Sequence, residues 1–285
     1  MREKLAVSDS LHGLLAALTL PDLSVSVKTR VPFHPGKMVA GAKLFCADMA
    51  EPSVYVFNAG TLQHELTLPA APEIEALALS PNGTRLYALA GGADSLQMLD
   101  AARGRLLNIV KAGMHPRAVA QDESSACIAV AAGATGEVMI LDSGTLRVLG
   151  VYRADGVTCG CCFFAGQLMI LCMAGEYDVG TIVGAISPEG KWTPWVKLPG
   201  LPGAMAPCGG GLLVGHLNGL TMLDAPNGRI RWQTKIAGLP SAIVPVERFA
   251  CFMDSLEGMI GLVELRRGTI MRRLGVGEPG GIAVL

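Results

Sequence analysis

The chain has 285 residues, of which 51% are hydrophobic and 16% are charged. That balance is typical of a chain that buries a core, and it excludes extended disorder. The 23 basic and 24 acidic residues give a formal net charge of −1, so no basic surplus favours binding to nucleic acid. No segment approaches the ~20 apolar residues of a membrane-spanning helix. The N-terminal residues also lack a signal-peptide cleavage pattern, and we expect a cytoplasmic protein.

Taken in chain order, the expected elements are short strands separated by turns. Their lengths, their Gly, Pro, Asn and Asp punctuation and the absence of long segments of helical period all favour strands. The first three are expected at 5–8, 14–20 and 24–31. The others are expected at 43–46, 54–57, 63–68, 76–79, 85–89, 96–99, 106–110, 118–120, 127–130, 138–141, 147–152, 159–164, 167–171, 181–186, 195–198, 204–207, 212–214, 220–223, 230–236, 242–246, 249–252, 259–265, 270–274 and 280–285.

A polar turn recurs along the chain and measures the length of a repeat. Its copies begin at positions 58, 100, 142, 187, 224 and 264, which are 37–45 residues apart, and a weaker copy lies at 22. Units of about 40 residues with four short strands are typical of β-propeller blades. We therefore predict an all-β fold, a seven-bladed β-propeller of four-stranded antiparallel blades that forms a single domain over residues 1–285. The C-terminal strand would join the N-terminal strands in one blade, which closes the ring and removes an exposed sheet edge.

The clearest unit, Ser80–Pro116, reads SPNGTRLYALAGGADSLQMLDAARGRLLNIVKAGMHP. It resembles the YVTN family of propeller repeats in its Ser-Pro-Asn-Gly turn, its Leu-Tyr strand, its Asp turn and its Gly-x-x-Pro link between blades. The resemblance implies a propeller fold, which surface-layer proteins, binding propellers and the propeller subunits of amine dehydrogenases share. A second stretch, Leu223–Trp232, is similar to a quinoprotein repeat, and Trp192 and Trp195 echo it. The acidic calcium and quinone ligands of those enzymes have no counterpart here, so we predict no such cofactor.

Candidate site residues come from two loop classes that reach the channel mouth of a propeller. The links between blades contribute His34, His115 and Glu278, and the ends of the second strands contribute Asp9, Asp48, Asp254 and His216. Most of these come from consecutive blades, whereas the other side of the ring carries Ala71, Ala90, Ala132 and Met173. We predict ligand binding by His34, His115, His216 and Glu278, and binding of a divalent metal ion by Asp9, Asp48 and Asp254. The alternative is that these aspartates fix turns through bonds to the backbone.

Eight cysteines follow no disulfide framework, and most lie inside apolar strands. We interpret them as reduced thiols that behave as small core residues. Cys159, Cys161 and Cys162 form the densest group, so a redox or soft-metal site is the alternative there.

The motifs name no reaction and no catalytic residue. Phosphate-binding glycine loops and the Gly-x-Ser-x-Gly motif are absent from the sequence. The first hypothesis is therefore a propeller scaffold that presents its loops around a central channel to a protein or peptide partner, without a cofactor. The alternative is a small-ligand binder or a hydrolase of the lactonase type, which would use the acidic pole with a divalent metal ion.

Overall fold

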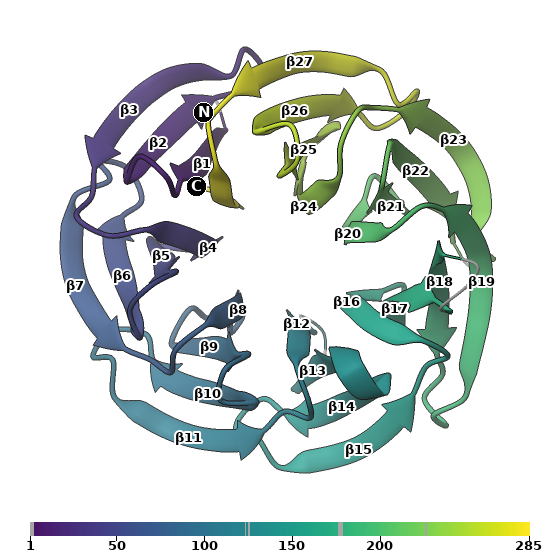
Figure 1. The fold of residues 1–285 in the computed structure, drawn as a ribbon. Coiled ribbons are helices and arrows are strands. Elements are labelled where there is room, and N and C mark those ends of the chain that lie inside the picture. The colour runs from purple at the N-terminus through teal and green to yellow at the C-terminus, as the bar shows by residue number, and fades with distance from the viewer. Residues whose placement is uncertain (1–2, 123, 125, 176–178, 226) are drawn as a thin grey trace.

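The computed structural model describes residues 3–122, 124, 126–175, 179–225 and 227–285, so Pro226 of the turn expected at 224–228 lies outside the described residues. The chain forms seven antiparallel four-stranded sheets arranged as a ring around a central channel (Figure 1). The predicted all-β, seven-bladed propeller is therefore confirmed. The one helix of the described chain is a single 3₁₀ turn, η1 (Gly133–Thr135).

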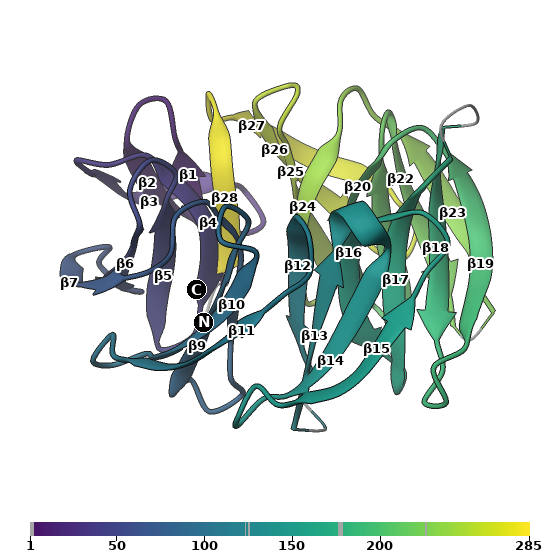
Figure 2. The same cartoon turned by 60° about the horizontal axis from the view of Figure 1, so that its bottom comes forward.

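Each blade contributes one innermost strand to the channel wall. These strands are β28 (Pro279–Val284), β4 (Pro35–Ala40), β8 (Ile74–Leu79), β12 (Pro116–Gln121), β16 (Val157–Phe164), β20 (Pro202–Cys208) and β24 (Pro240–Val246). In the tilted view, β12 and β16 run along the channel (Figure 2). The strand β4 has no counterpart among the expected elements, because its start, Pro35-Gly36-Lys37, has the composition of a link.

The second and third strands hold the core. The second strands are β1 (Lys4–Asp9), β5 (Lys43–Asp48), β9 (Arg85–Ala90), β13 (Cys127–Ala132), β17 (Gln167–Ala174), β21 (Gly211–His216) and β25 (Phe249–Asp254). The third strands are β2 (Leu14–Thr19), β6 (Ser53–Asn58), β10 (Ser95–Asp100), β14 (Glu137–Asp142), β18 (Gly180–Ile186), β22 (Gly219–Asp224) and β26 (Met259–Glu264). Because both faces of these strands meet a neighbouring blade, they read as continuous apolar runs.

The outer strands form the rim of the ring. They are β3 (Ser24–Arg30), β7 (His64–Pro69), β11 (Leu106–Lys111), β15 (Val148–Arg153), β19 (Trp192–Pro199), β23 (Arg229–Lys235) and β27 (Ile270–Gly275). Each pairs with its third strand through a register shift of one bulged residue. A bulge bends the strand and increases its twist, which suits the curved edge of a blade.

The first blade joins the two ends of the chain. β1 pairs antiparallel with β28, with Leu5 opposite Val284 and Val7 opposite Ile282. Leu5, Val7 and Ile282 are also buried together against blade 7. The predicted closure of the ring by the C-terminal strand is thus confirmed, and the two termini lie close together in Figure 1.

Apolar packing between adjacent blades accounts for the core. Buried side chains form seven clusters, one at each junction between blades. At the junction of blades 3 and 4, Tyr87 is fully buried. Its hydroxyl donates a 2.6 Å hydrogen bond to the carbonyl oxygen of Ser143, which belongs to the next blade. The Leu-Tyr strand of the repeat therefore ties neighbouring blades together.

Candidate functional site

Seven register shifts on the innermost strands shape the channel. In each blade the pairing with the second strand skips one or two residues near the start of the innermost strand, after its first residue in six blades and after its second in β16. In β12, for example, Pro116 pairs with Ala132 and Ala118 pairs with Ala131, so Arg117 is a bulged residue without a pairing partner on β13. A bulge redirects the side chain of its extra residue. The bulged residues consequently line the channel instead of packing inside the blade.

The bulged side chains form a group that we call the channel ring. Its members are Lys37, Glu75, Arg117, Cys159 and Ser241. In the remaining two blades the skipped residues are small, namely Gly203 with Ala204 and Gly280 with Gly281. Glu75 and Arg117 form an ion pair between blades 3 and 4, with 3.4 Å between Oε2 and Nη1. These side chains line a channel cavity of about 240 Å³ that all seven innermost strands bound.

Glycine is required on one side of the channel because the blades approach closely there. A Cβ added at Gly203 would collide with the carbonyl oxygen of Pro240. A Cβ at Gly281 would collide with the carbonyl oxygen of Gly36. The ring therefore has a charged arc, formed by Lys37, Glu75 and Arg117, and an arc of small residues opposite.

A wider mouth cavity of about 460 Å³ opens onto the channel. It shares Lys37, Glu75, Ser241, Met253 and Gly280 with the channel cavity. Its ionisable lining consists of the carboxyl groups of Asp48, Glu73, Glu75 and Glu278 and the ammonium group of Lys37. The mouth is therefore acidic, and Glu73 and Glu278 are exposed to solvent.

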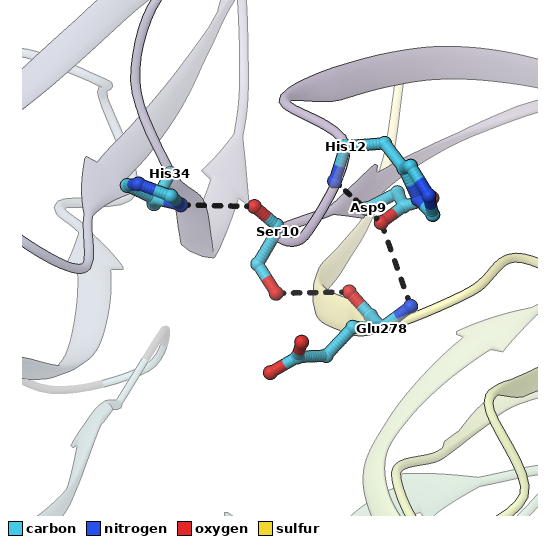
Figure 3. A network of polar contacts seen from close by, with 5 residues as sticks. All are labelled: Asp9, Ser10, His12, His34 and Glu278. Atoms are coloured by element: carbon cyan, nitrogen blue, oxygen red, sulfur yellow. Dashed lines mark hydrogen bonds and ion pairs between the residues drawn. The ribbon is translucent and has the colours of Figure 1, made fainter.

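The structure brings three of the predicted residues together at the junction of blades 7, 1 and 2 (Figure 3). The main-chain amide of Glu278 lies 3.5 Å from the carboxylate of Asp9, and the Ser10 hydroxyl donates to the carbonyl oxygen of Glu278 at 3.0 Å. His34 Nδ1 donates to the carbonyl oxygen of Ser10 at 3.1 Å. The Asp9 carboxylate also pairs with His12 Nδ1 at 2.8 Å. Ser10 and His12, which the sequence reasoning passed over, complete this network.

The three predicted metal-binding aspartates each hold a turn. Asp48 accepts the amide of Ala50 at 2.9 Å. Asp254 accepts the amides of Leu239, Leu256 and Glu257 at 3.0–3.2 Å, and so fixes the link from the preceding blade. Over the described part of the chain, no three His, Cys, Asp or Glu side chains are grouped so that they could hold a metal ion. Metal binding by Asp9, Asp48 and Asp254 stays a prediction, and it does not enter the function proposed below.

The remaining two predicted histidines lie apart from the mouth cavity. The amide of His115 donates to the carboxylate of Asp94 at 2.9 Å, and this bond fixes a blade link. His216 is buried, with Nδ1 3.3 Å from the carbonyl oxygen of Leu217 and Nε2 3.0 Å from the hydroxyl of Thr221. Burial lowers the pKa of His216, because desolvation disfavours the imidazolium ion. The main chain of His115 and the side chain of His216 thus make structural contacts, and ligand binding by these two residues stays a prediction.

The cysteine group divides between three environments. Cys159 lines the channel, Cys161 packs between blades 4 and 5, and Cys162 packs between blades 5 and 6. Burial raises the pKa of Cys161 to about 12, and it raises the pKa of Cys162 as well. Because the Cys-x-x-Cys spacing of 159 and 162 lies on a strand, these two thiols do not meet as they would in a loop. The arrangement favours the interpretation of the buried pair as core residues.

Of the predicted ligand-binding and metal-binding residues, Asp48 and Glu278 line the mouth cavity. Lys37, Glu73 and Glu75 line it too, but the sequence reasoning missed them. Two ring members have a sequence signal, since Arg117 and Ser241 directly follow the link proline in His115-Pro116-Arg117 and Leu239-Pro240-Ser241, whereas Lys37, Glu75 and Cys159 do not directly follow a proline. No helix of the described residues is long and apolar enough to cross a membrane.

Comparison with known proteins shows the fold alone. No family model matches the sequence, and no curated protein does. The structure is similar to hydrazine synthase of Kuenenia stuttgartiensis, with a TM-score of 0.80 and 15% identity over 90% of this chain and 91% of that one. It is similar to a functionally unknown protein of Desulfotomaculum acetoxidans, with a TM-score of 0.81 and 10% identity over 99% of this chain and 98% of that one. It is also similar to a chain of a mitotic checkpoint complex, with a TM-score of 0.70 and 12% identity over 87% of this chain and 80% of that one.

Proposed function

We propose that this protein is a binding module whose channel mouth receives a cationic segment of a peptide or protein partner. The observation that carries the proposal is the lining of the mouth cavity, which contains four acidic residues and a single lysine. A concave site lined by one sign of charge concentrates the field and attracts ligands of the opposite sign. The kinship with YVTN repeats, carried by Ser80–Pro116, is part of the same proposal, since that family includes binding propellers.

The shape of the cavity suits a lysine or arginine side chain. Met49, Ile74 and Met253 supply apolar surface within the same lining. The aliphatic stem of a long basic side chain packs well on such surface while its charged head meets carboxylates. Glu75 is already paired with Arg117, so Glu73 and Glu278 are the carboxylates best placed to attract the incoming cation.

The ring of blades provides the rigidity that such a site needs. The mouth residues stand on strand ends and links that Asp9, Asp48 and Asp254 fix by accepting hydrogen bonds from backbone amides. A preorganised site orders fewer groups on binding and so loses less free energy. The partner class, a basic peptide segment, agrees with the acidic pole predicted from the sequence.

The test measures binding of a fluorescein-labelled peptide of alternating lysine and glycine by fluorescence anisotropy. We expect the double variant Glu73→Gln/Glu278→Gln to bind about tenfold more weakly at low salt, because each screened ion pair is worth about 0.5–1 kcal/mol. The loss should shrink as salt is raised. The control is Asp22→Asn, since Asp22 is an exposed carboxylate that follows β2 at the end of blade 1 away from Asp9.

Two outcomes would contradict the proposal. One is that the wild-type protein does not bind the peptide. The other is that Asp22→Asn weakens binding as much as the double variant does, because the attraction would then come from the overall charge and not from the mouth.

A further inference from the structure

The outer strands are open sheet edges, and the register makes their residues comparable between blades. In β11, Leu106 pairs with Leu99, Leu107 is bulged, and Ile109 pairs with Gln97. We call these three places the rim positions of a blade. In β15 the rim positions are Val148, Leu149 and Val151.

Blades 3 and 4 differ from the other five at the rim positions. In β11 and β15 all three residues are aliphatic, and their exposed fractions are 37–53%. Every other blade carries a charged residue there. The rim positions of those blades are Val25, Ser26 and Lys28; His64, Glu65 and Thr67; Pro194, Trp195 and Lys197; Ile230, Arg231 and Gln233; Ile270, Met271 and Arg273. Charged residues on edge strands prevent unwanted pairing, so five blades are protected and two are not.

Cations flank both aliphatic triads at matching places. Arg105 and Lys111 flank the triad of β11, and Arg147 and Arg153 flank that of β15, each 42 residues further along the chain. The stretches 101–111 and 143–153 contain no acidic residue. Asp100 and Asp142, just before them, are held by the amides of their own turns. None of the ion pairs of the described chain uses the four flanking cations.

The two strands are neighbours on the rim (Figure 1). The side-chain amide of Asn108 in β11 donates to the carbonyl oxygen of Thr145, just before β15, at 2.6 Å. The edges differ in one respect. The amide of Ile109 donates to the side-chain oxygen of Asn108 at 2.8 Å, which caps part of the β11 edge. No described side chain caps an amide of β15, so β15 is the more open edge.

We propose that the rim formed by β11 and β15 is a second docking surface, which takes an extended acidic segment of a partner protein. The segment would add to β15 as an antiparallel or parallel strand, placing alternate aliphatic side chains beside Val148 and Val151 and carboxylates near Arg147 and Arg153. Strand addition supplies affinity through main-chain hydrogen bonds, and alternate side chains supply specificity. This site is separate from the mouth and has the opposite charge.

Charge and hydrogen bonding select this occupant over two others. A second copy of the chain would bring the same cations to the interface, and like charges across an interface are costly. An anionic membrane would satisfy the cations and the aliphatic side chains, but lipid cannot pair with the open main-chain groups of an edge strand. An acidic extended segment would pair with the cations, contact the aliphatic side chains and hydrogen-bond to the open main-chain groups.

The test uses a labelled short peptide of alternating glutamate and valine and measures its binding by fluorescence anisotropy. The variants are Val151→Lys and Ile109→Lys. Lysine is compatible with the fold at this rim position, since Lys28 and Lys197 occupy it in blades 1 and 5. We expect Val151→Lys to weaken binding about tenfold and Ile109→Lys about threefold, because aliphatic contact with the peptide is lost. Thr67→Lys adds the same charge at the rim position of blade 2 and should leave binding unchanged.

The added lysine separates the proposal from simple charge attraction. If cations alone held the peptide, Val151→Lys would strengthen binding, and that result would overturn the proposal. Failure of the wild-type protein to bind the peptide would overturn it as well. So would a dimer that Val151→Lys abolishes in light scattering, or flotation with phosphatidylglycerol vesicles in place of peptide binding. The mouth variant Glu73→Gln/Glu278→Gln should bind this peptide as the wild type does.

Discussion

Replacing Tyr87 with phenylalanine tests how far a single hydroxyl ties two blades together. The Tyr87 side chain is fully buried at the junction of blades 3 and 4, and its hydroxyl donates to the carbonyl oxygen of Ser143 at 2.6 Å. Tyr87→Phe keeps the aromatic ring of the side chain and removes the hydroxyl donor. The carbonyl keeps one weaker partner, Arg85 Nη1 at 3.4 Å.

The expected loss of stability follows from those contacts. A typical intramolecular hydrogen bond contributes about 0.5–1.5 kcal/mol net, and a buried acceptor left without any partner costs about 1–3 kcal/mol. Because Arg85 continues to donate to the same carbonyl, the full penalty does not apply. We expect Tyr87→Phe to lower the free energy of unfolding by about 0.5–1.5 kcal/mol.

Urea unfolding followed by circular dichroism measures this difference, with an unchanged m-value as the sign that the folded state stays intact. Tyr55→Phe is the matched control. Tyr55 stacks on Phe33 with 3.8 Å between ring centroids, and its hydroxyl has no hydrogen bond among the described residues. That control should change stability by less than about 0.5 kcal/mol. Equal effects of the two substitutions, or no effect of Tyr87→Phe, would refute the assignment of a stabilising bond between blades.

Two further predictions concern buried titratable groups. Burial lowers the pKa of His216 in the folded protein. As the pH falls below about 6.5, this histidine is therefore protonated in the unfolded chain before it is protonated in the folded one, and the folded state loses stability. His216→Gln should flatten the pH dependence of urea unfolding in that range, and an unchanged slope would exclude His216 as its source. Burial also raises the pKa of Cys172, Cys208 and Cys251 to about 12. In the native protein an aromatic disulfide reagent should therefore label only the half-buried Cys127 and Cys159, with Cys159 the slower of the two because burial raises its pKa as well. Rapid labelling of a third thiol would contradict the burial of the other six.

The fold could be predicted from the sequence because each blade repeats the same physical requirements. Apolar second and third strands, polar turns and link prolines recur at a near-constant spacing. A strand that is ambiguous in one unit can therefore be identified from the equivalent strand of the next unit. The closure of the ring could be predicted because the N-terminal segment, which contains Leu5, supplies three strands of a blade and the C-terminal segment, which contains Ile282, supplies the fourth. The whole of β4 escaped prediction because Gly36 and Lys37 form a bulge, and a bulge has no periodic signal.

The candidate site was harder to predict, since residue type does not reveal which way a side chain points. Asp9 and Asp254 are acidic residues at strand ends, which suits a ligand site and a turn equally well. The structure shows that their carboxylates bind backbone amides. Glu75 and Arg117 lie near the starts of short innermost strands. The alternation of side chains along a regular strand does not predict their direction, because a bulge at each position turns the side chain into the channel.

The two proposed surfaces share an origin in the repeat. A position that packs in the core is held to apolar residues in every blade, as Leu86 and Leu44 are in the second strands. The bulged residues of the inner strands and the rim positions of the outer strands do not pack in the core, so packing does not restrict them. Differences between blades at such positions therefore reflect solubility or binding. The rims of blades 3 and 4 depart from the charged pattern that solubility favours, and they depart from it in the same way, with matching flanking cations. Solubility alone does not account for that agreement, which is why binding of an acidic strand is the more economical explanation.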